Sequence, residues 1–330
     1  MLYSIHFLRF IAATSVVFYH ASSVFTRDTI FETPIFAAGV DVFFVISGCV
    51  ITLSTYEKHD TLDFIIRRFL RIFPIYWIAT ALYILFDYVV WKSLPSYRDT
   101  WHSILLFPNP KQDPWFPIYY PGWSLFYECV FYAIFASAFA FSRKPLIFAV
   151  VVITLLIFSP LRPLISRYCD TRMFVEFLFG LFIAIAWKNN VRVPTPIAIL
   201  CLICACAMAV FYRFPGENWR SFEWGGPAVL FVIGMTMFEG RMWTRHPLAI
   251  LLGNASYAIY LTHITTAKVI SKFADVNKIV MTDNPLIYTF VIVCVAIAMG
   301  SVFHIFIEKP MLSAFRKLRL GSKSPIVSST

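Results

Sequence analysis

The chain has 330 residues, of which 59% are apolar and only 14% are charged, and its formal net charge is +10. Soluble domains contain about 45–50% apolar and about 25% charged residues, so this composition excludes a chain built mainly of water-soluble domains. The basic residues are spread around the edges of apolar runs and form no basic domain with interleaved aromatics, which argues against a nucleic-acid partner.

Apolar runs of about 17 to 25 residues, long enough to cross a bilayer as helices, recur along the whole chain. Because helices satisfy their own backbone inside a membrane, we predict an all-α fold, a polytopic integral membrane bundle of about ten transmembrane helices. Nine or eleven crossings also fit, since two of the runs are short. The expected spans are 3–25, 36–54, 72–91, 121–141, 146–159, 174–187, 194–213, 224–238, 247–266 and 285–307.

The ends of the chain and its loops predict its orientation. The first apolar run lacks a basic leader and a persuasive cleavage site, so we expect a retained span. The short inner loops are the more densely basic, which places both termini in the cytoplasm. Residues 1–312 are expected to form the transmembrane domain and residues 313–330 a short basic cytoplasmic tail. The positive charge favours membrane lipid and a phosphate-bearing donor as partners, and the cysteine pattern indicates no metal site.

Ionisable side chains at membrane depth cost about 2.5 to 3.5 kcal/mol each on insertion scales, so each needs a partner, a cavity or a function. Arg9 and His20 lie in the first span and line one helix face, about 20° apart around the axis and about 16 Å apart along it. His20, nearer the outside, is a candidate base for a sugar hydroxyl. A structural polar contact between helices is the alternative.

Asp41 opens the second span, just after the short outer hairpin that follows His20. We therefore expect Asp41 to lie near His20 and to orient its ring. An N-cap role in its own helix explains Asp41 equally well. Ser47 and Gly48, further along this span, are explained by close helix packing alone.

Arg68 and Arg71 are three residues apart beside the third span and share one helix face at the inner boundary. Such a pair can bind phosphate oxygens bidentately, which the adenosine-phosphate end of coenzyme A would offer. Basic clusters beside a span also fix topology without any ligand, and the spacing does not separate these alternatives.

Ser124, Glu128 and Tyr132 recur every four residues in the fourth span and form a polar stripe on one face. Glu128 is suited to bind an acceptor hydroxyl, or to hold Arg9 or His20, and a polar seam between helices is the alternative. We expect such polar side chains, from separate helices, to meet in a single buried chamber open to the cell interior. Weaker candidates are Asp87, Glu176, His263 and His304.

In their order and spacing, these motifs resemble the membrane-bound acyltransferase 3 family, and more closely its exopolysaccharide-production acetyltransferase type. Each motif alone is weak, but the ordered set is specific and runs from Ser4 to Pro310. The motifs are Arg9 with His20, the run Gly39 to Gly48, Arg68 with Arg71, Ser124 with Glu128 and Phe131-Tyr132, the run Ala255 to His263, and Glu308-Lys309-Pro310.

The resemblance implies an O-acyltransferase in a bacterial inner membrane. The donor would be cytoplasmic acetyl-CoA, and the acceptor a sugar hydroxyl of an extracytoplasmic polysaccharide or a lipid-linked oligosaccharide. His20 would deprotonate this hydroxyl for direct attack or carry the acyl group transiently. The expected site residues are His20, Arg9 and Asp41 for catalysis, Arg68 and Arg71 for the donor, and Ser124, Glu128 and Tyr132 for the acceptor.

Two other functional classes remain open from the sequence. A non-enzymatic glycan or lipid transporter would use the buried charges to line a permeation path, although the arginine pair argues mildly against it. A structural subunit of a polysaccharide export complex would need only that the helices pack. Homo-oligomers and polysaccharide-assembly proteins are the protein partners that these readings allow.

Overall fold

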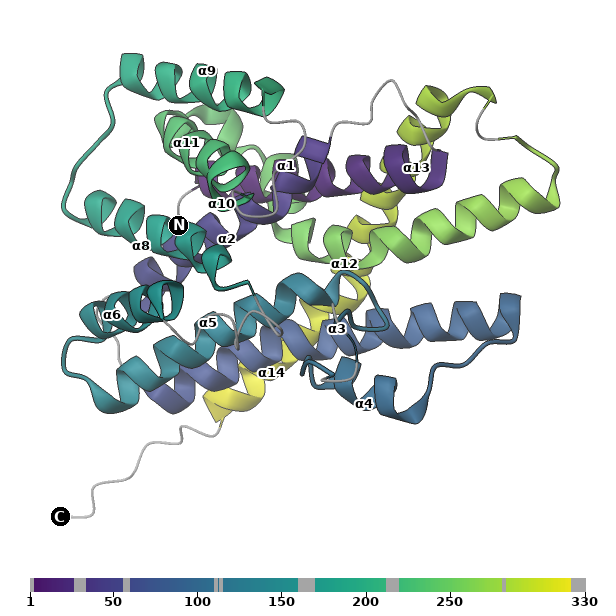
Figure 1. The fold of residues 1–330 in the computed structure, drawn as a ribbon, viewed down its shortest axis with the longest axis horizontal. Helices are drawn as coiled ribbons and strands as arrows, with labels where there is room; N and C mark the ends of the chain where they lie inside the picture. Colours follow the sequence, from purple (N-terminus) through teal and green to yellow (C-terminus); the bar gives the residue numbers. More distant parts are fainter. Residues whose placement is uncertain are drawn as a thin grey trace.

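The computed structural model describes residues 3–26, 34–55, 60–109, 112, 115–159, 170–211, 220–280 and 283–321. Within these residues the chain is helical and contains no strand. Most of the long helices run side by side along the longest axis of the molecule (Figure 1). The predicted all-α membrane bundle is therefore confirmed.

Each of the ten expected spans falls on a helix. Among the described residues, six helical segments are long and apolar enough to cross a membrane, so the number of ten spans is not confirmed. The six are Pro34–Ser54, Thr61–Trp91, Gly122–Phe141, Arg220–Phe238, Pro247–Val276 and Pro285–Lys317. The principal helices are α1 (Tyr3–Tyr19), α2 (Gly39–Thr55), α3 (Thr61–Trp91), α5 (Gly122–Phe141), α6 (Pro145–Phe158), α8 (Phe174–Lys188), α9 (Thr195–Phe211), α11 (Gly225–Met235), α12 (Pro247–Val276) and α13 (Pro285–Phe303). Three further helices are α4 (Tyr97–Ile104), α10 (Arg220–Glu223) and α14 (Lys309–Gly321).

Helix α3 begins well before the start expected from hydropathy, at Thr61. The side chain of Asp60 caps it by accepting a hydrogen bond from the amide of Asp63 at 3.0 Å. The carboxylate of Asp63 in turn pairs with Arg67 at 2.6 Å, one turn further on. These polar contacts stabilise a helix that begins before the basic cluster. Arg68 and Arg71 therefore lie within its first turns.

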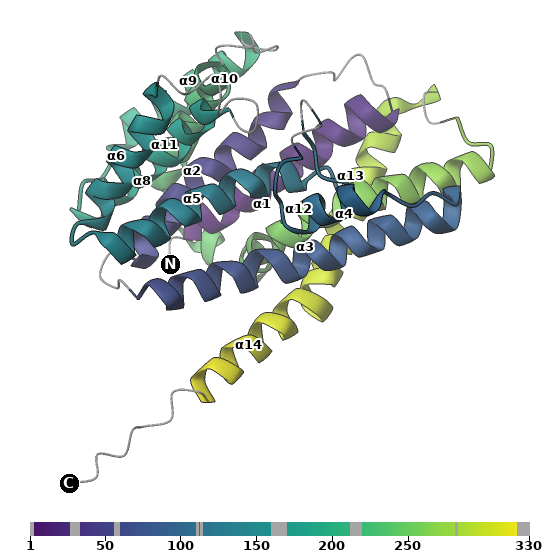
Figure 2. The same ribbon diagram turned by 60° about the horizontal axis from the view of Figure 1, so that its bottom comes forward.

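Two π-helical segments interrupt the regular helices. The first, η1 (His20–Thr26), follows α1, and the second, η7 (His304–Glu308), joins α13 to α14. Such segments are rare and frequently lie at functional sites. Helix α14, which leaves the bundle at one end (Figure 2), continues across the expected domain boundary after residue 312. Residues 322–330 of the expected tail lie outside the described residues.

Helices α2 and α8 approach closely through two glycines. A Cβ on Gly48 would meet the backbone oxygen of Phe177, and a Cβ on Gly180 would meet the backbone oxygen of Val45. The thiol of Cys49 also donates a hydrogen bond to the carbonyl of Gly180 at 3.0 Å. Close packing therefore accounts for Gly48, as expected, because small residues let membrane helices approach.

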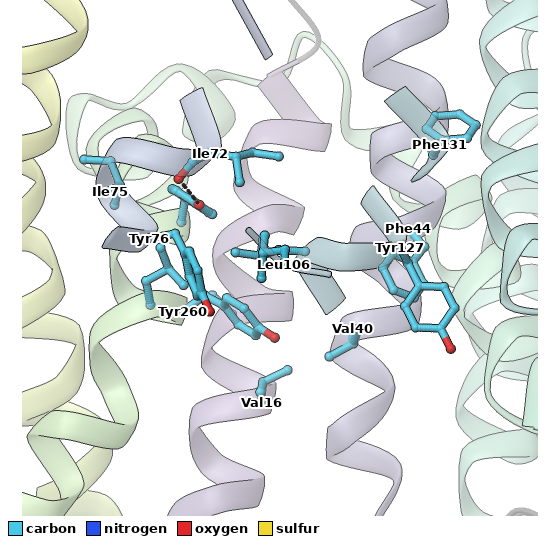
Figure 3. Packing of buried hydrophobic residues seen from close by; sticks show 14 of the residues in the cluster. Val16, Val40, Phe44, Ile72, Ile75, Tyr76, Leu106, Tyr127, Phe131 and Tyr260 are labelled. Carbon is cyan, nitrogen blue, oxygen red and sulfur yellow. Dashed lines mark hydrogen bonds between the residues drawn. The ribbon is translucent and has the colours of Figure 1, made fainter. Parts of the chain in front are cut away.

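A buried aromatic and aliphatic cluster joins α1, α2, α3, α5 and α12 (Figure 3). Phe44 of α2 stacks on Phe177 of α8 with ring centroids 4.8 Å apart. The hydroxyl of Tyr257 in α12 donates to the carbonyl of Ile72 in α3 at 3.0 Å. This cluster fixes the five helices whose polar side chains form the site described below.

We expect Gly180→Ala to lower the thermal unfolding temperature, because the added methyl group collides with a backbone oxygen that cannot rotate away. Overpacking of this kind typically costs about 1–3 kcal/mol. Fluorescence-detected size-exclusion chromatography of heated, detergent-solubilised protein measures the effect. Gly226→Ala is the control, since its Cβ would meet only the flexible end of Met208, at 3.2 Å. Equal stability of the two variants would contradict the packing argument.

Candidate functional site

Three adjoining pockets, which we call inner, central and outer, follow the length of α1. Counted together with the open solvent space at their mouths, their volumes are about 1180, 700 and 520 Å³ respectively. Arg9, Val50 and Arg71 line both the inner and the central pocket. Val40 and Tyr260 line both the central and the outer pocket. The pockets therefore form a series from one end of α1 to the other.

The central pocket gathers six of the eight predicted site residues. They come from three helices that are far apart in the sequence, α1, α3 and α5. These residues are Arg9, Arg68, Arg71, Ser124, Glu128 and Tyr132. The structure thus places the proposed donor residues and the polar stripe of α5 against one shared space.

The central pocket carries more positive than negative charge. Glu128 accepts hydrogen bonds from Tyr132 and from Ser47, the latter at 3.0 Å. Within the described chain, Arg9 and Arg71 form no salt bridge, although Glu128 lies within electrostatic range of Arg9. Three guanidinium groups, those of Arg9, Arg68 and Arg71, thus face one carboxylate. Such an excess of positive charge at membrane depth suits an anionic ligand.

Arg68 is held in place by neighbouring side chains. Its guanidinium donates to the hydroxyl of Ser54 at 2.9 Å. It also lies over the rings of Phe64 and Tyr132, at 5.4 and 5.2 Å from their centroids. These contacts favour a fixed orientation of the planar guanidinium. Arg71 lines both the inner and the central pocket, whereas Arg68 lines the central one.

The inner pocket is polar and contains a buried acid–base pair. Nδ1 of His304 lies 2.6 Å from the carboxylate of Glu308, and both side chains are buried at the start and end of η7. Arg316 of α14 and Asn254 of α12 also line this pocket. Glu308 lies within electrostatic range of Arg9, so the pair contributes to the charge balance of the inner end.

The expected single chamber is divided by Tyr260. Its hydroxyl oxygen lies 2.8 Å from that of Ser124 and 3.1 Å from the carbonyl oxygen of Pro121. This tyrosine therefore stands between the central pocket and the outer one, where His20 lies. The hydroxyl of Ser124 lies within hydrogen-bonding distance of both the Tyr260 hydroxyl and the Pro121 carbonyl, so it is engaged within the protein.

The outer pocket surrounds His20 with aromatic rings. Tyr19, Tyr120, Trp123 and Trp224 line it together with Arg220. The ring centroid of Tyr120 is 6.0 Å from that of His20. Burial raises the pKa of the Tyr120 phenol, so this hydroxyl stays protonated and can donate a hydrogen bond. Aromatic faces and neutral donors of this kind suit a sugar ring.

Asp41 has another partner than the His20 predicted for it. It is the third residue of α2, so it does not cap the helix, and its fully buried carboxylate accepts a hydrogen bond from Arg220 at 3.1 Å. The structure pairs it with Arg220 in place of His20. A guanidinium charge stabilises a buried carboxylate better than a neutral imidazole does. Glu176 of α8, also buried, lies within electrostatic range of Asp41 and Arg220.

Of two further residues in the outer pocket region, Arg220 was missed as a site candidate and His263 was named only as a weaker one. Arg220 lies just before the eighth expected span, 224–238, so the cost of a charge at membrane depth did not single it out. His263 lies in the run Ala255 to His263, but only the structure reveals its contact with His20, whose Nδ1 is 3.2 Å from its Nε2. Neither partner could be assigned without knowing which helices adjoin.

The amino-acid sequence matches those of known proteins over most of its length. The profile of the acyltransferase domain of the acyltransferase 3 family matches residues 2–304. The exopolysaccharide production protein ExoZ of Rhizobium meliloti is 33% identical over 253 residues, which cover 72% of this chain and 78% of that protein. No solved structure matches the chain.

Two further relatives are longer proteins. The peptidoglycan O-acetyltransferase OatA of Listeria monocytogenes is 25% identical, over 79% of this chain and 48% of its own length. The putative peptidoglycan O-acetyltransferase YrhL of Bacillus subtilis is 26% identical, over 66% of this chain and 31% of its own length. The chain thus corresponds to about half or less of these two proteins.

We expect Arg220→Met to destabilise the protein strongly, because it leaves the carboxylate of Asp41 buried without its partner. Breaking a buried ion pair typically costs about 3–5 kcal/mol. Thermal unfolding in detergent is the measurement, and the double variant Asp41→Asn with Arg220→Met should regain part of the loss. Arg67→Met, which removes a partly exposed pair with Asp63, is the control, with an expected cost of about 0.3–0.5 kcal/mol. A loss no larger than the control's would contradict the pairing.

Proposed function

The chain belongs to the acyltransferase 3 family, and from this premise we propose that it is a membrane carbohydrate O-acetyltransferase. It takes an acetyl group from acetyl-CoA at the cytoplasmic side and transfers it to a sugar hydroxyl of a polysaccharide or lipid-linked oligosaccharide beyond the other side. One observation carries the proposal: a cationic pocket with six predicted site residues adjoins, through Val40 and Tyr260, an aromatic pocket that contains His20.

The donor enters through the inner pocket, which faces the cytoplasm in this proposal. Its phosphates bind the cationic surface that Arg71 and Arg9 present, and Arg68 completes it with a guanidinium oriented by Ser54. The thin pantetheine arm then passes Arg9 and follows α1 through the central pocket. The thioester reaches Tyr260, at the boundary with the outer pocket. This orientation puts both termini in the cytoplasm and the protein in a bacterial inner membrane.

The acceptor sugar binds in the outer pocket against the rings of Tyr120, Trp123 and Trp224. His20 takes the proton of a sugar hydroxyl as that oxygen attacks the thioester carbon. The new carbon–oxygen bond forms, the carbon–sulfur bond breaks, and the departing thiolate receives the proton from His20. The products are an acetyl ester and free coenzyme A.

Labelled acetyl-CoA supplied to the purified protein in liposomes, with an acceptor glycan, tests the activity directly. We expect label to move to the glycan with the wild type, and His20→Ala and Arg9→Ala to abolish the transfer, since they remove the base and a donor-facing charge. A transporter would move glycan without coenzyme A, and an export subunit would do neither. Full glycan acetylation in both variants, at normal membrane levels, would refute the catalytic assignment. Label retained on wild-type protein without acceptor would indicate an acyl-histidine intermediate.

Comparing acetyl-CoA with the truncated donor S-acetyl-pantetheine, which lacks the adenosine-phosphate end, tests phosphate recognition. Arg71→Ala should raise the KM for acetyl-CoA by about 10- to 100-fold, since a hydrogen bond to a charged group contributes about 1.5–3 kcal/mol. It should leave the KM for S-acetyl-pantetheine nearly unchanged. Arg67→Ala is the matched control, because Arg67 is partly exposed, pairs with Asp63 and lines none of the three pockets. Equal effects of Arg71→Ala on both donors would contradict a phosphate-binding role.

A further inference from the structure

Two histidines from distant parts of the chain meet beside the outer pocket. Nδ1 of His20, at the end of α1, lies 3.2 Å from Nε2 of His263 in α12, and the ring centroids are 5.0 Å apart. His263 is only 1% exposed. The contacts of this buried pair indicate which of its ring nitrogens carry hydrogen.

The neighbouring carbonyl groups determine which nitrogens carry hydrogen. Nδ1 of His263 lies 2.6 Å from the carbonyl oxygen of Tyr260. A carbonyl oxygen can only accept, so this nitrogen carries the hydrogen, and Nε2 of the neutral ring is then an acceptor. Nδ1 of His20 faces this acceptor and also the carbonyl oxygen of Val16, at 3.0 Å. Since both neighbours accept, Nδ1 of His20 must be the donor.

We propose that His263 is a positioning residue that fixes His20 as the tautomer with hydrogen on Nδ1, leaving Nε2 free to take the acceptor proton. Nε2 of His20 forms no hydrogen bond to any described residue, whereas Nδ1 has two acceptors. The role rests on the function proposed above. It gives His20 the orienting partner that Asp41, bound to Arg220, does not supply.

The local backbone supports this arrangement. The π-helical segment η1 begins at His20, one turn after Val16, whose carbonyl faces the imidazole. Tyr260 links the two ends of the site, because its carbonyl orients His263 and its hydroxyl contacts Ser124 at the pocket boundary. A neutral partner also avoids a buried negative charge beside His20 before substrate binds.

During transfer, Nε2 of His20 accepts the hydroxyl proton and later releases it to the thiolate. Throughout this cycle the Nδ1 hydrogen stays in place and donates to Nε2 of His263. The positive charge that develops on His20 is stabilised by this hydrogen bond and by the carbonyl of Val16. His263 itself neither gains nor loses a proton.

Nitrogen-15 NMR of protein labelled in its histidines tests the tautomer directly. The signals lost in His20→Ala identify those of His20 in the wild type. We expect a protonated Nδ1 and an unprotonated Nε2 for this residue in the resting protein. The opposite tautomer, or a doubly protonated ring, would overturn the proposal. The measurement needs no catalytic turnover.

Two substitutions of His263 then test its role in transfer. His263→Leu removes the acceptor and should lower kcat by about 10- to 100-fold, within the range of about 10²- to 10⁴-fold that a general base contributes. The KM for acetyl-CoA should not change. His263→Gln can still accept from His20 through its amide oxygen and donate to the Tyr260 carbonyl, so it should restore most of kcat. Thr262→Val, which removes a hydroxyl bonded to Ala258, is the neighbouring control.

An unchanged kcat in His263→Leu would overturn the proposal. Equal losses of kcat in His263→Leu and His263→Gln, together with reduced thermal stability, would also overturn it, because they would indicate a structural role only. Should His263→Leu fail to fold, the tautomer measured in the wild type decides. A wild-type protein that transfers no acetyl group would refute the proposed function, whereas the NMR measurement would still decide the tautomer of His20.

Discussion

A charge inside a membrane must be compensated, and this constraint governs the structure. Where compensation comes from another side chain, the contact is structural: Asp41 with Arg220 joins α2 to α10, and His304 pairs with Glu308 within the π-helical segment η7. Where compensation is incomplete, as for Arg71 in the central pocket, the excess charge favours a ligand that supplies the missing negative charge. The uneven distribution of partners therefore separates residues that hold the bundle together from those that face a substrate.

The apolar packing makes this separation possible. The glycine contact between α2 and α8 and the aromatic cluster around Phe44 hold the polar faces of five helices against a common space. Tyr260 belongs to this cluster and also binds Ser124, so a core residue forms the boundary between the cationic and aromatic pockets. A donor with an anionic end and a neutral reactive end suits such a gradient of polarity along one helix.

ExoZ and OatA differ in the polymer named for each, and they match 72% and 79% of this chain respectively. In our proposal the inner and central pockets bind the donor in the same way for every acceptor, whereas the outer pocket selects the acceptor. Differences in acceptor would then arise from side chains such as Tyr120, Trp123 and Trp224, which line the outer pocket.

The sequence by itself determined the membrane class, the helical fold and the family, because hydropathy and ordered motifs are properties of the chain. It also placed Arg9 and His20 on one helix and Glu128 with Tyr132 on another, because helical periodicity is local. Side-chain contacts between different helices could not be predicted from periodicity. Asp41 and Arg220 are 179 positions apart, and His20 and His263 are 243 positions apart. Tertiary packing alone decided these pairs, as well as the division of the expected chamber by Tyr260, because only the folded bundle sets which helix faces meet.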